Sequence, residues 1–191
     1  PTMNAVAKHL SQGKKIQREC KVIAISQNQK GWELKTEGGE LFLCHRLLMA
    51  LPVPQSLALL NAGGVCLNKK ILSSLEDVQY ESCLAGCLLL KGASEIPETG
   101  VVEKDDFFSW ISDRTAREGN DRLHSTIVVH APGDWSSAHY SISEEEILEI
   151  FEGRLKPWIG NRIVLEKKRH RWKFAKVIEP YSERFYLNPE G

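Results

Sequence analysis

The sequence has no excess of charge of either sign, because 25 Lys and Arg residues balance 25 Asp and Glu residues. Such a chain has no overall field that recruits nucleic acid or an anionic membrane. Long apolar runs are also missing: the longest, residues 47–53 and 84–90, are far shorter than the roughly 18 residues that a membrane-spanning helix needs. We therefore expect neither a nucleic acid nor a membrane as a partner.

Motifs for phosphate, metal and serine nucleophiles are missing as well. No G-x-G-x-x-G or G-x-x-x-x-G-K-[ST] pattern occurs, so the usual glycine-rich site for a dinucleotide pyrophosphate is not expected. Neither C-x-x-C, H-E-x-x-H nor G-x-S-x-G occurs, which disfavours a metal site and a serine hydrolase. The five cysteines are odd in number and lie mostly in apolar runs, which indicates reduced, buried thiols. We expect an intracellular protein, in the cytoplasm or the plastid stroma.

The N-terminal part of the sequence combines helix and strand patterns. Residues 3–10 predict a short amphipathic helix. Residues 20–51 predict an antiparallel three-stranded meander, because two glycine-containing turns separate three β-prone runs. Residues 54–60 and 67–75 predict two further helices.

The remaining sequence predicts a sheet and one clear helix. Residues 143–155 have one apolar helix face, with Ser143 as the N-cap and Glu146 as its capping-box partner. Strands are expected at residues 82–90, 107–112, 126–130, 161–165 and 170–175, the first of them apolar enough to be central. The fold class predicted is α+β: a mixed, mainly antiparallel sheet with helices on one side, preceded by the three-stranded meander.

Residues 167–173 form a basic run that contains Trp172, a pattern compatible with nucleic-acid binding. As a strand, however, the run would place Lys168, His170 and Trp172 on one face. The other basic side chains would share the opposite face, which we expect to be solvated. We favour the strand.

Three segments place aromatic and polar side chains together at strand ends or within a strand. They are residues 107–114, residues 128–132 with Trp135 and His139 shortly after, and residues 170–172. Stacking surfaces beside a few oriented polar groups are typical of a site for a flat heteroaromatic ligand. The alternative is that each Trp is a core residue and each His a hydrogen-bonded structural residue.

In their order and spacing, these segments resemble the renalase-like branch of the FAD-dependent amine oxidases. The motifs that carry the resemblance are M-N-A-V-A-K-H-L (residues 3–10), V-I-A-I (22–25), G-W (31–32), L-M-A-L-P-V-P-Q (48–55), W-I-S-D-R (110–114), V-V-H-A (128–131), W-S-S-A-H (135–139) and H-R-W (170–172). The sequence departs from the family in lacking its glycine-rich nucleotide motifs. It also has Asp113 where a small polar amide is expected and Arg117 where lysine is common.

The resemblance implies that the chain is part of a longer flavoprotein, with both chain ends inside the parent enzyme. Residues 1–53 would belong to the FAD-binding domain and residues 54–191 to the substrate-binding domain. In that family a reduced organic substrate, such as a dihydronicotinamide or an amine, passes a hydride to FAD, which oxygen reoxidises. The expected partners are therefore a small-molecule substrate and the missing FAD-binding segments of the parent chain. Without those segments the chain is expected to be inactive and not to retain FAD.

Candidate site residues follow from the residue pattern and the resemblance together. His130 and His170 are the candidate catalytic groups, and no metal ligands are proposed. We expect the two histidines to lie on neighbouring strands and to face a common concave surface, which is the shared-site hypothesis. The candidate substrate-binding residues are Trp110, Asp113, Arg117 and Trp172, and the candidate cofactor-binding residues are Val22, Ala50, Leu51 and Pro52. Two other functions remain open: a non-catalytic ligand-binding or interaction domain, and a flavin-dependent desaturase or protoporphyrinogen-type oxidase on the same scaffold.

Overall fold

The computed structural model describes residues 4–97, 99, 101–102, 105–118 and 123–188. Contacts divide the chain into two compact units, Pro1–Asp77 with Tyr181–Gly191, and Val78–Pro180. We refer to them as the first and the second unit. The expected boundary between the parent enzyme's domains was residue 53, and the assignment of the two units to those domains stays a prediction.

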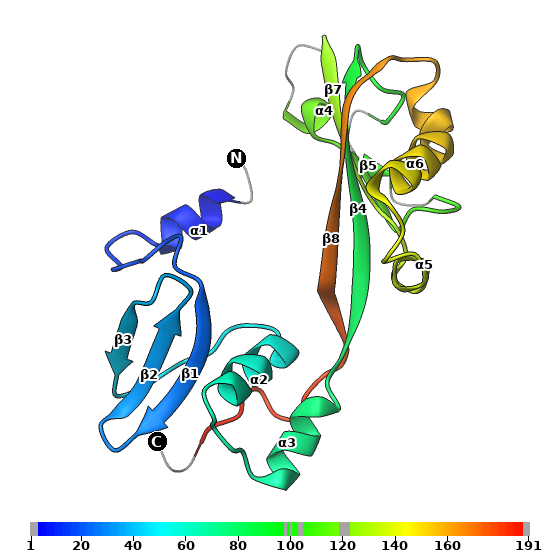
Figure 1. Cartoon of the computed structure of the whole chain (residues 1–191). Coiled ribbons are helices and arrows are strands. Elements are labelled where there is room, and N and C mark those ends of the chain that lie inside the picture. Colours follow the sequence, from blue (N-terminus) through cyan, green and yellow to red (C-terminus); the bar gives the residue numbers. More distant parts are fainter. Residues whose placement is uncertain (1–3, 98, 100, 103–104, 119–122, 189–191) are drawn as a thin grey trace. The chain divides into compact units, whose positions relative to one another are not determined.

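The first unit contains the predicted three-stranded meander, which is confirmed. Its strands are β1 (Val22–Asn28), β2 (Gly31–Thr36) and β3 (Leu41–Cys44), paired antiparallel in the order β1-β2-β3 (Figure 1). The third strand ends at Cys44 rather than at residue 51. Cys44 pairs with Trp32, next to the first residue of β2, so the backbone beyond Cys44 has no strand to pair with.

Three helices complete the first unit. They are α1 (Asn4–Leu10), α2 (Val53–Ala62) and α3 (Lys69–Glu76), close to the three predicted helices. Asn68 caps α3 by accepting a hydrogen bond from the Lys70 amide. Met3, with which the first helix was predicted to begin, lies outside the described residues.

The second unit is built on a five-stranded antiparallel sheet in the order β5-β6-β7-β4-β8. The strands are β4 (Gln79–Lys91), β5 (Val101–Val102), β6 (Trp110–Asp113), β7 (His124–His130) and β8 (Val164–Glu179). As predicted, the apolar run at residues 82–90 lies in an internal strand, with β7 on one side and β8 on the other. The two strands predicted near the C-terminus are one continuous strand, β8.

The helix α6 (Glu144–Ile159) covers one face of this sheet. Ser143 caps it as predicted, its Oγ accepting a hydrogen bond from the Glu146 amide at 3.2 Å. Side chains from the helix and the sheet form a common core, which includes Leu84, Leu88, Ile127, Ile147, Phe151 and Leu155. We call this face of the sheet the covered face.

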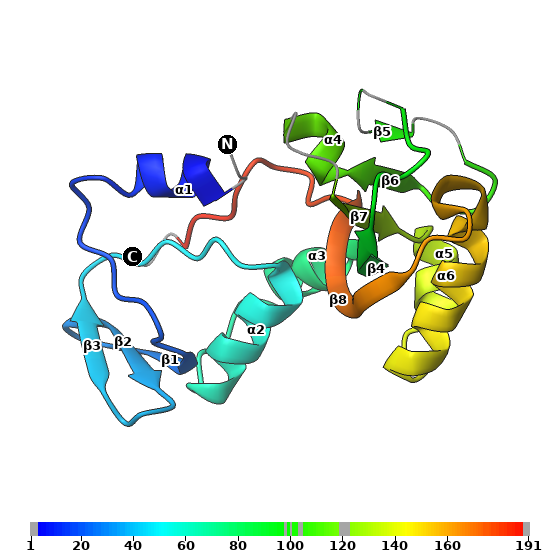
Figure 2. The same ribbon diagram turned by 90° about the horizontal axis from the view of Figure 1, so that it is seen from above.

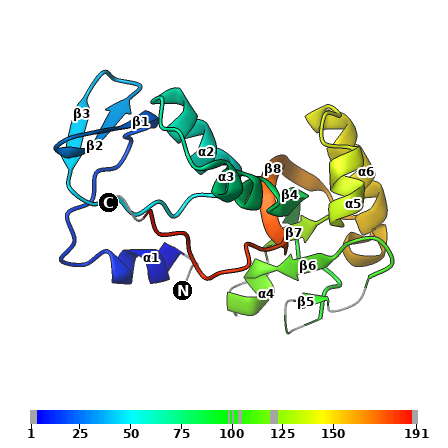
Figure 3. The same cartoon turned by 90° about the horizontal axis from the view of Figure 1, so that it is seen from below.

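Two shorter helices were not predicted. In Figures 1 and 3, α5 (Gly133–Ala138) lies on the same side of the sheet as α6, and α4 (Arg114–Glu118) lies on the other side. The view from above in Figure 2 shows α5 and α6 together along the sheet. The predicted α+β class, with a mainly antiparallel sheet packed against helices and a separate meander, is confirmed.

The alternation predicted for the basic run in β8 is confirmed by the strand register. The second face of the run is not simply solvated, because its side chains reach α6 and the segment before it. Lys167 forms an ion pair with Glu152 at 2.9 Å, and the Arg171 guanidinium lies 5.5 Å from the Tyr140 ring centroid. Among the described residues, no helix has the length and apolar character needed to cross a membrane.

Candidate functional site

One row of side chains crosses four strands of the second unit's sheet. Ala85 on β4 pairs with His130 on β7 and with His170 on β8, and His130 also pairs with Trp110 on β6. Directly paired residues of antiparallel strands point to the same face of a sheet. We call these four residues the Ala85 row.

The Ala85 row lies on the face opposite α6, which we call the open face. The next pairs along the strands, Ile111 with Val129 and Val129 with Gly86, alternate to the covered face. Ile111 and Val129 are fully buried there, and Phe151 of α6 packs over Gly86. Trp110, by contrast, keeps 39% of its surface exposed.

The geometry of the row places two imidazoles on either side of a small residue. Because neighbouring strands lie about 4.8 Å apart, the backbones of His130 and His170 are separated by roughly 10 Å with Ala85 between them. Trp172, in register with Cys83, extends the aromatic surface, and its ring lies 4.4 Å from that of His170 at 59°. The open face therefore offers indole and imidazole surfaces around a narrow floor.

His130 and His170 were expected on neighbouring strands, and this was wrong. β4 lies between β7 and β8, so the two histidines are second neighbours that share Ala85 as their common partner. They nevertheless point to the same face, as the shared-site hypothesis requires.

His130 is the more firmly held of the two histidines. Its carbonyl accepts hydrogen bonds from the Ser109 amide at 2.9 Å and the Ser109 hydroxyl at 3.0 Å. Burial lowers the pKa of its imidazole from the ordinary value of 6.5. A neutral imidazole has one donor and one acceptor nitrogen, so near neutral pH His130 can orient a polar group without carrying charge.

A buried serine fixes the strands beneath the row. The Ser136 hydroxyl on α5 accepts a hydrogen bond from the Leu84 amide at 2.9 Å and donates one to the Ala131 carbonyl at 3.4 Å. The Ala131 amide also bonds to the Leu84 carbonyl at 3.0 Å. These bonds join the residue that follows His130 to the residue that precedes Ala85.

Asp113 does not join the row. It pairs with Ile127 at the buried end of β6 and is only 2% exposed. Its carboxylate accepts hydrogen bonds from the Ser94 hydroxyl at 2.6 Å and from the amides of Thr115 and Ala116 at the start of α4. The geometry gives Asp113 a structural task rather than the expected contact with substrate. Arg117 lies in α4, but its side chain is outside the described part of the chain.

The candidate cofactor-binding residues all lie in the first unit. Val22 is the first residue of β1, beside an irregularity in its pairing with β2. Ala50, Leu51 and Pro52 form an irregular segment before α2, and Leu51 is 48% exposed. The Pro52 carbonyl accepts hydrogen bonds from the Gln55 and Ser56 amides at the start of α2. A role of this segment in holding a cofactor stays a prediction.

Several supporting residues were not identified from the sequence. The sequence did contain a sign of a narrow place at Ala85, because Ala85 and Gly86 are small residues within a run of larger apolar side chains. Ser109 and Ser136 carried none, because their roles depend on hydrogen bonds between segments distant in the sequence.

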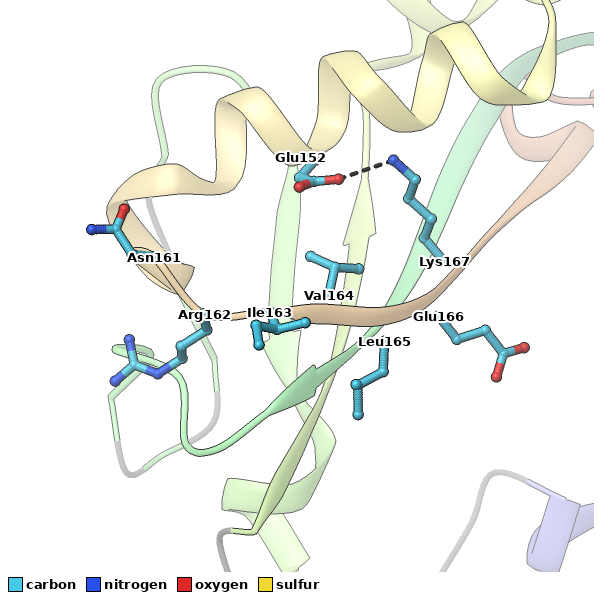
Figure 4. Close-up of a pocket in the computed structure, with 8 residues that line it drawn as sticks. All are labelled: Glu152, Asn161, Arg162, Ile163, Val164, Leu165, Glu166 and Lys167. Carbon is cyan, nitrogen blue, oxygen red and sulfur yellow. Dashed lines mark hydrogen bonds and ion pairs between the residues drawn. The ribbon is translucent and has the colours of Figure 1, made fainter.

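The second unit also has an open pocket of about 360 Å³ beside β8. Glu152 and residues 161–167 line it, and the ion pair between Glu152 and Lys167 lies along its edge (Figure 4). Arg162 pairs with Glu95 at 2.6 Å. The pocket contains none of the candidate site residues, so we place the candidate site on the open face. The described residues contain no group of three or more His, Cys, Asp or Glu side chains placed to hold a metal ion.

Solved structures with a similar fold include an oxidoreductase, a mutase and a variant of putrescine oxidase. An oxidoreductase from Methanosarcina mazei has a TM-score of 0.61 and 13% identity, over 90% of this chain and 42% of its own. Reduced UDP-galactopyranose mutase has a TM-score of 0.61 and 13% identity, over 84% and 36%. A triple mutant of putrescine oxidase has a TM-score of 0.60 and 11% identity, over 86% and 37%. At these identities the likeness is one of fold, and the chain spans less than half the length of each structure.

The sequence itself identifies the family more directly. The family described as flavin containing amine oxidoreductase matches residues 2–183, which is nearly the whole chain. The protein therefore belongs to the flavin-containing amine oxidoreductase family.

Proposed function

We propose that this chain provides the substrate-facing sheet of a flavin-dependent oxidoreductase, with the Ala85 row as the wall against which a reduced organic substrate lies. The observation that carries the proposal is the alignment of Trp110, His130 and His170 with Ala85 on the one face that α6 does not cover. The family match supports the flavin chemistry.

The residues of the row would bind and orient the substrate. Trp110 and Trp172 offer exposed indole surfaces for stacking a flat ring. The imidazoles of His130 and His170 would donate or accept hydrogen bonds at the polar edge of that ring. The small side chain of Ala85 leaves room between them.

FAD, when bound, supplies the acceptor for a hydride that leaves the substrate. Val22, Ala50, Leu51 and Pro52 would contact it in the first unit, and the FAD-binding segments of the parent chain would supply its other contacts. We propose a renalase-like specificity, with a dihydronicotinamide as substrate, on the basis of the sequence motifs and of the exposed indoles of Trp110 and Trp172.

Histidine variants of the full-length flavoprotein test this proposal. His130→Ala and His170→Ala should each lower turnover by about tenfold or more, because oriented polar groups contribute on that scale. Both should lower the melting temperature only slightly, since neither side chain belongs to the buried core of the second unit.

His139→Ala is the matched control, because His139 lies on the covered side of the sheet. Its ring stacks on that of Trp135, with the two ring centroids 4.0 Å apart. The substitution should lower stability and leave turnover of the folded fraction unchanged. Normal turnover in both row variants, together with a loss of melting temperature, would instead make His130 and His170 structural residues.

A further inference from the structure

The pairing of β4 with β7 becomes irregular just beyond the Ala85 row. His130 is the last residue of β7, and beyond its pair with Ala85 the next residues to face each other are Leu84 and Ala131. In a regular antiparallel ladder, a pair at this position exchanges two backbone hydrogen bonds. The Ala131 amide donates the first of them directly, to the Leu84 carbonyl at 3.0 Å.

The Ser136 hydroxyl stands in the place of the second backbone bond. The Leu84 amide donates to Ser136 Oγ at 2.9 Å, and Ser136 Oγ donates in turn to the Ala131 carbonyl at 3.4 Å. A direct bond would hold the amide nitrogen and the carbonyl oxygen about 2.9 Å apart, whereas a hydroxyl between them needs more space. The hydroxyl therefore sets the spacing of the two backbones beside the row.

The hydroxyl is held firmly in this position. Ser136 is completely buried and lies on α5, on the covered side of the sheet. The next residue of α5, Ser137, shares a hydrogen bond of 2.8 Å with Ser82, so α5 is attached to β4 at Ser82 and at Leu84. A buried amide without an acceptor is unfavourable, so loss of the Ser136 hydroxyl should draw the Leu84 amide toward the β7 backbone.

We propose that Ser136 is a positioning residue of the substrate site, and that its hydroxyl sets the distance between His130 and Ala85. His130 directly precedes Ala131, and Ala85 directly follows Leu84, so a change of spacing between Leu84 and Ala131 moves both residues of the row. Ser136 would thus fix the width of the row without touching the substrate. This inference rests on the proposed function, because it takes the row to be the substrate site.

The first test measures the position of His130 in this chain. The imidazole signals of the wild-type protein and of Ser136→Ala are compared by NMR, with assignments from single His→Asn variants. The His130 signals should shift in Ser136→Ala, while those of His170, which pairs with Ala85 from the opposite side of β4, should change much less.

Ser137→Ala is the matched control for this measurement. It removes a hydroxyl from the same helix and a hydrogen bond to the same strand, but its partner Ser82 lies farther from the row. The His130 signals should therefore stay at their wild-type positions in Ser137→Ala.

The second test measures flavin reduction by substrate in the full-length flavoprotein. Ser136→Ala should lower the reduction rate by about tenfold, because a small misplacement of an orienting group is costly for the reaction. Ser137→Ala should react like wild type. Ser136→Thr keeps the hydroxyl and should keep the reduction rate, although its added methyl group should lower the melting temperature.

The possible outcomes separate the positioning role from the proposed function. Unchanged His130 signals in Ser136→Ala would overturn the positioning role, and so would a reduction rate that falls equally in the Ala and Thr variants. If His130→Ala slows flavin reduction and Ser136→Ala does not, the row remains the substrate site and Ser136 has no part in it. If neither variant slows flavin reduction, the proposed function fails and the positioning role fails with it.

Discussion

The buried carboxylate of Asp113 joins three segments of the second unit. It accepts hydrogen bonds from Ser94 in the loop after β4 and from two amides of α4, at the end of its own strand β6. Ser94 is itself held by Ser125 on β7, whose hydroxyl accepts a bond from the Ser94 amide at 3.0 Å. A polar residue beside an aromatic strand can thus be fully engaged within the fold.

Replacement of Asp113 should therefore cost stability. In Asp113→Ala the Ser94 hydroxyl and two α4 amides lose their acceptor, and we expect a loss of about 2–3 kcal/mol in the free energy of unfolding. Asp106→Ala, at an exposed aspartate nearby, should change it by less than about 0.5 kcal/mol. Urea denaturation of both variants measures the difference, and equal midpoints would contradict the structural task of Asp113.

His130 should couple protonation to stability. Because burial lowers its pKa in the folded state below 6.5, the unfolded state takes up a proton first as the pH falls. The stability should therefore be complete above about pH 6.5 and decline as the pH falls toward the folded-state pKa.

The His130→Asn variant isolates this contribution. The difference in unfolding free energy between wild type and variant should shrink between about pH 7.5 and about pH 5.5, with wild type losing more. His9→Asn, at an exposed histidine on α1, is the control for the same substitution elsewhere in the chain. If the difference in unfolding free energy between wild type and His130→Asn does not change with pH, the pKa of His130 is the same in the folded and unfolded states, and the account of this residue is wrong.

At the scale of elements, the packing of α6 on the sheet depends on Gly86. A Cβ at this position would lie 2.7 Å from Phe151 and 3.1 Å from Val129. Gly86→Ala should therefore destabilise the second unit by about 1–3 kcal/mol through overpacking.

Gly153 provides the matched control on the helix side. It lies on the exposed side of α6, with no neighbouring atom within 4 Å of an added Cβ. Gly153→Ala should stabilise the protein by about 0.5–1 kcal/mol, because glycine is a poor helix former. Relative to wild type, the melting temperature of Gly86→Ala should fall and that of Gly153→Ala should rise. A rise in both variants would contradict the close contact at Gly86.

The sequence predicted those helices, strands and turns whose formation depends on interactions between residues close together in the chain. The apolar run of β4, the Ser143 cap of α6 and the turns of the meander all act over a few neighbouring residues. The short helices α4 and α5 were missed because they have only five and six residues, too few to show a helical repeat of apolar positions. Asp113, directly before α4, accepts hydrogen bonds from the Thr115 and Ala116 amides as an N-cap residue does. β8 was divided in two because the charged residues between its apolar ends weaken the strand pattern, and pairing with β4 supplies what that pattern lacks.

The candidate site shows a different limit. Sequence alternation could place His170 and Trp172 on one face of a strand, and this is correct. It could not show that β4 enters between β7 and β8, because strand order depends on long-range pairing. For the same reason Ala85, the residue at which both histidines meet, was not recognised.

At the scale of the whole molecule, we predict that this chain folds but does not retain FAD. Its sequence lacks the glycine-rich turn that holds a dinucleotide pyrophosphate at a helix N-terminus. Backbone contacts near Val22 and residues 50–52 would contribute about 1 kcal/mol each, less than the several kcal/mol that association costs. The purified protein should be colourless, and calorimetry should show no saturable binding at micromolar FAD. A yellow preparation would mean that the cofactor binds by another route or that a second chain completes the site.

The most direct test of the Ala85 row measures flavin reduction by substrate, without oxygen, in the full-length flavoprotein. The series Ala85→Gly, wild type, Ala85→Val and Ala85→Phe progressively fills the space between His130 and His170. If the substrate lies on the row, its apparent affinity should fall as the side chain grows, with Ala85→Phe weakened by about tenfold or more, while the glycine variant stays close to wild type. Reduction kinetics that do not change with the size of residue 85, in folded protein with bound FAD, would contradict the account.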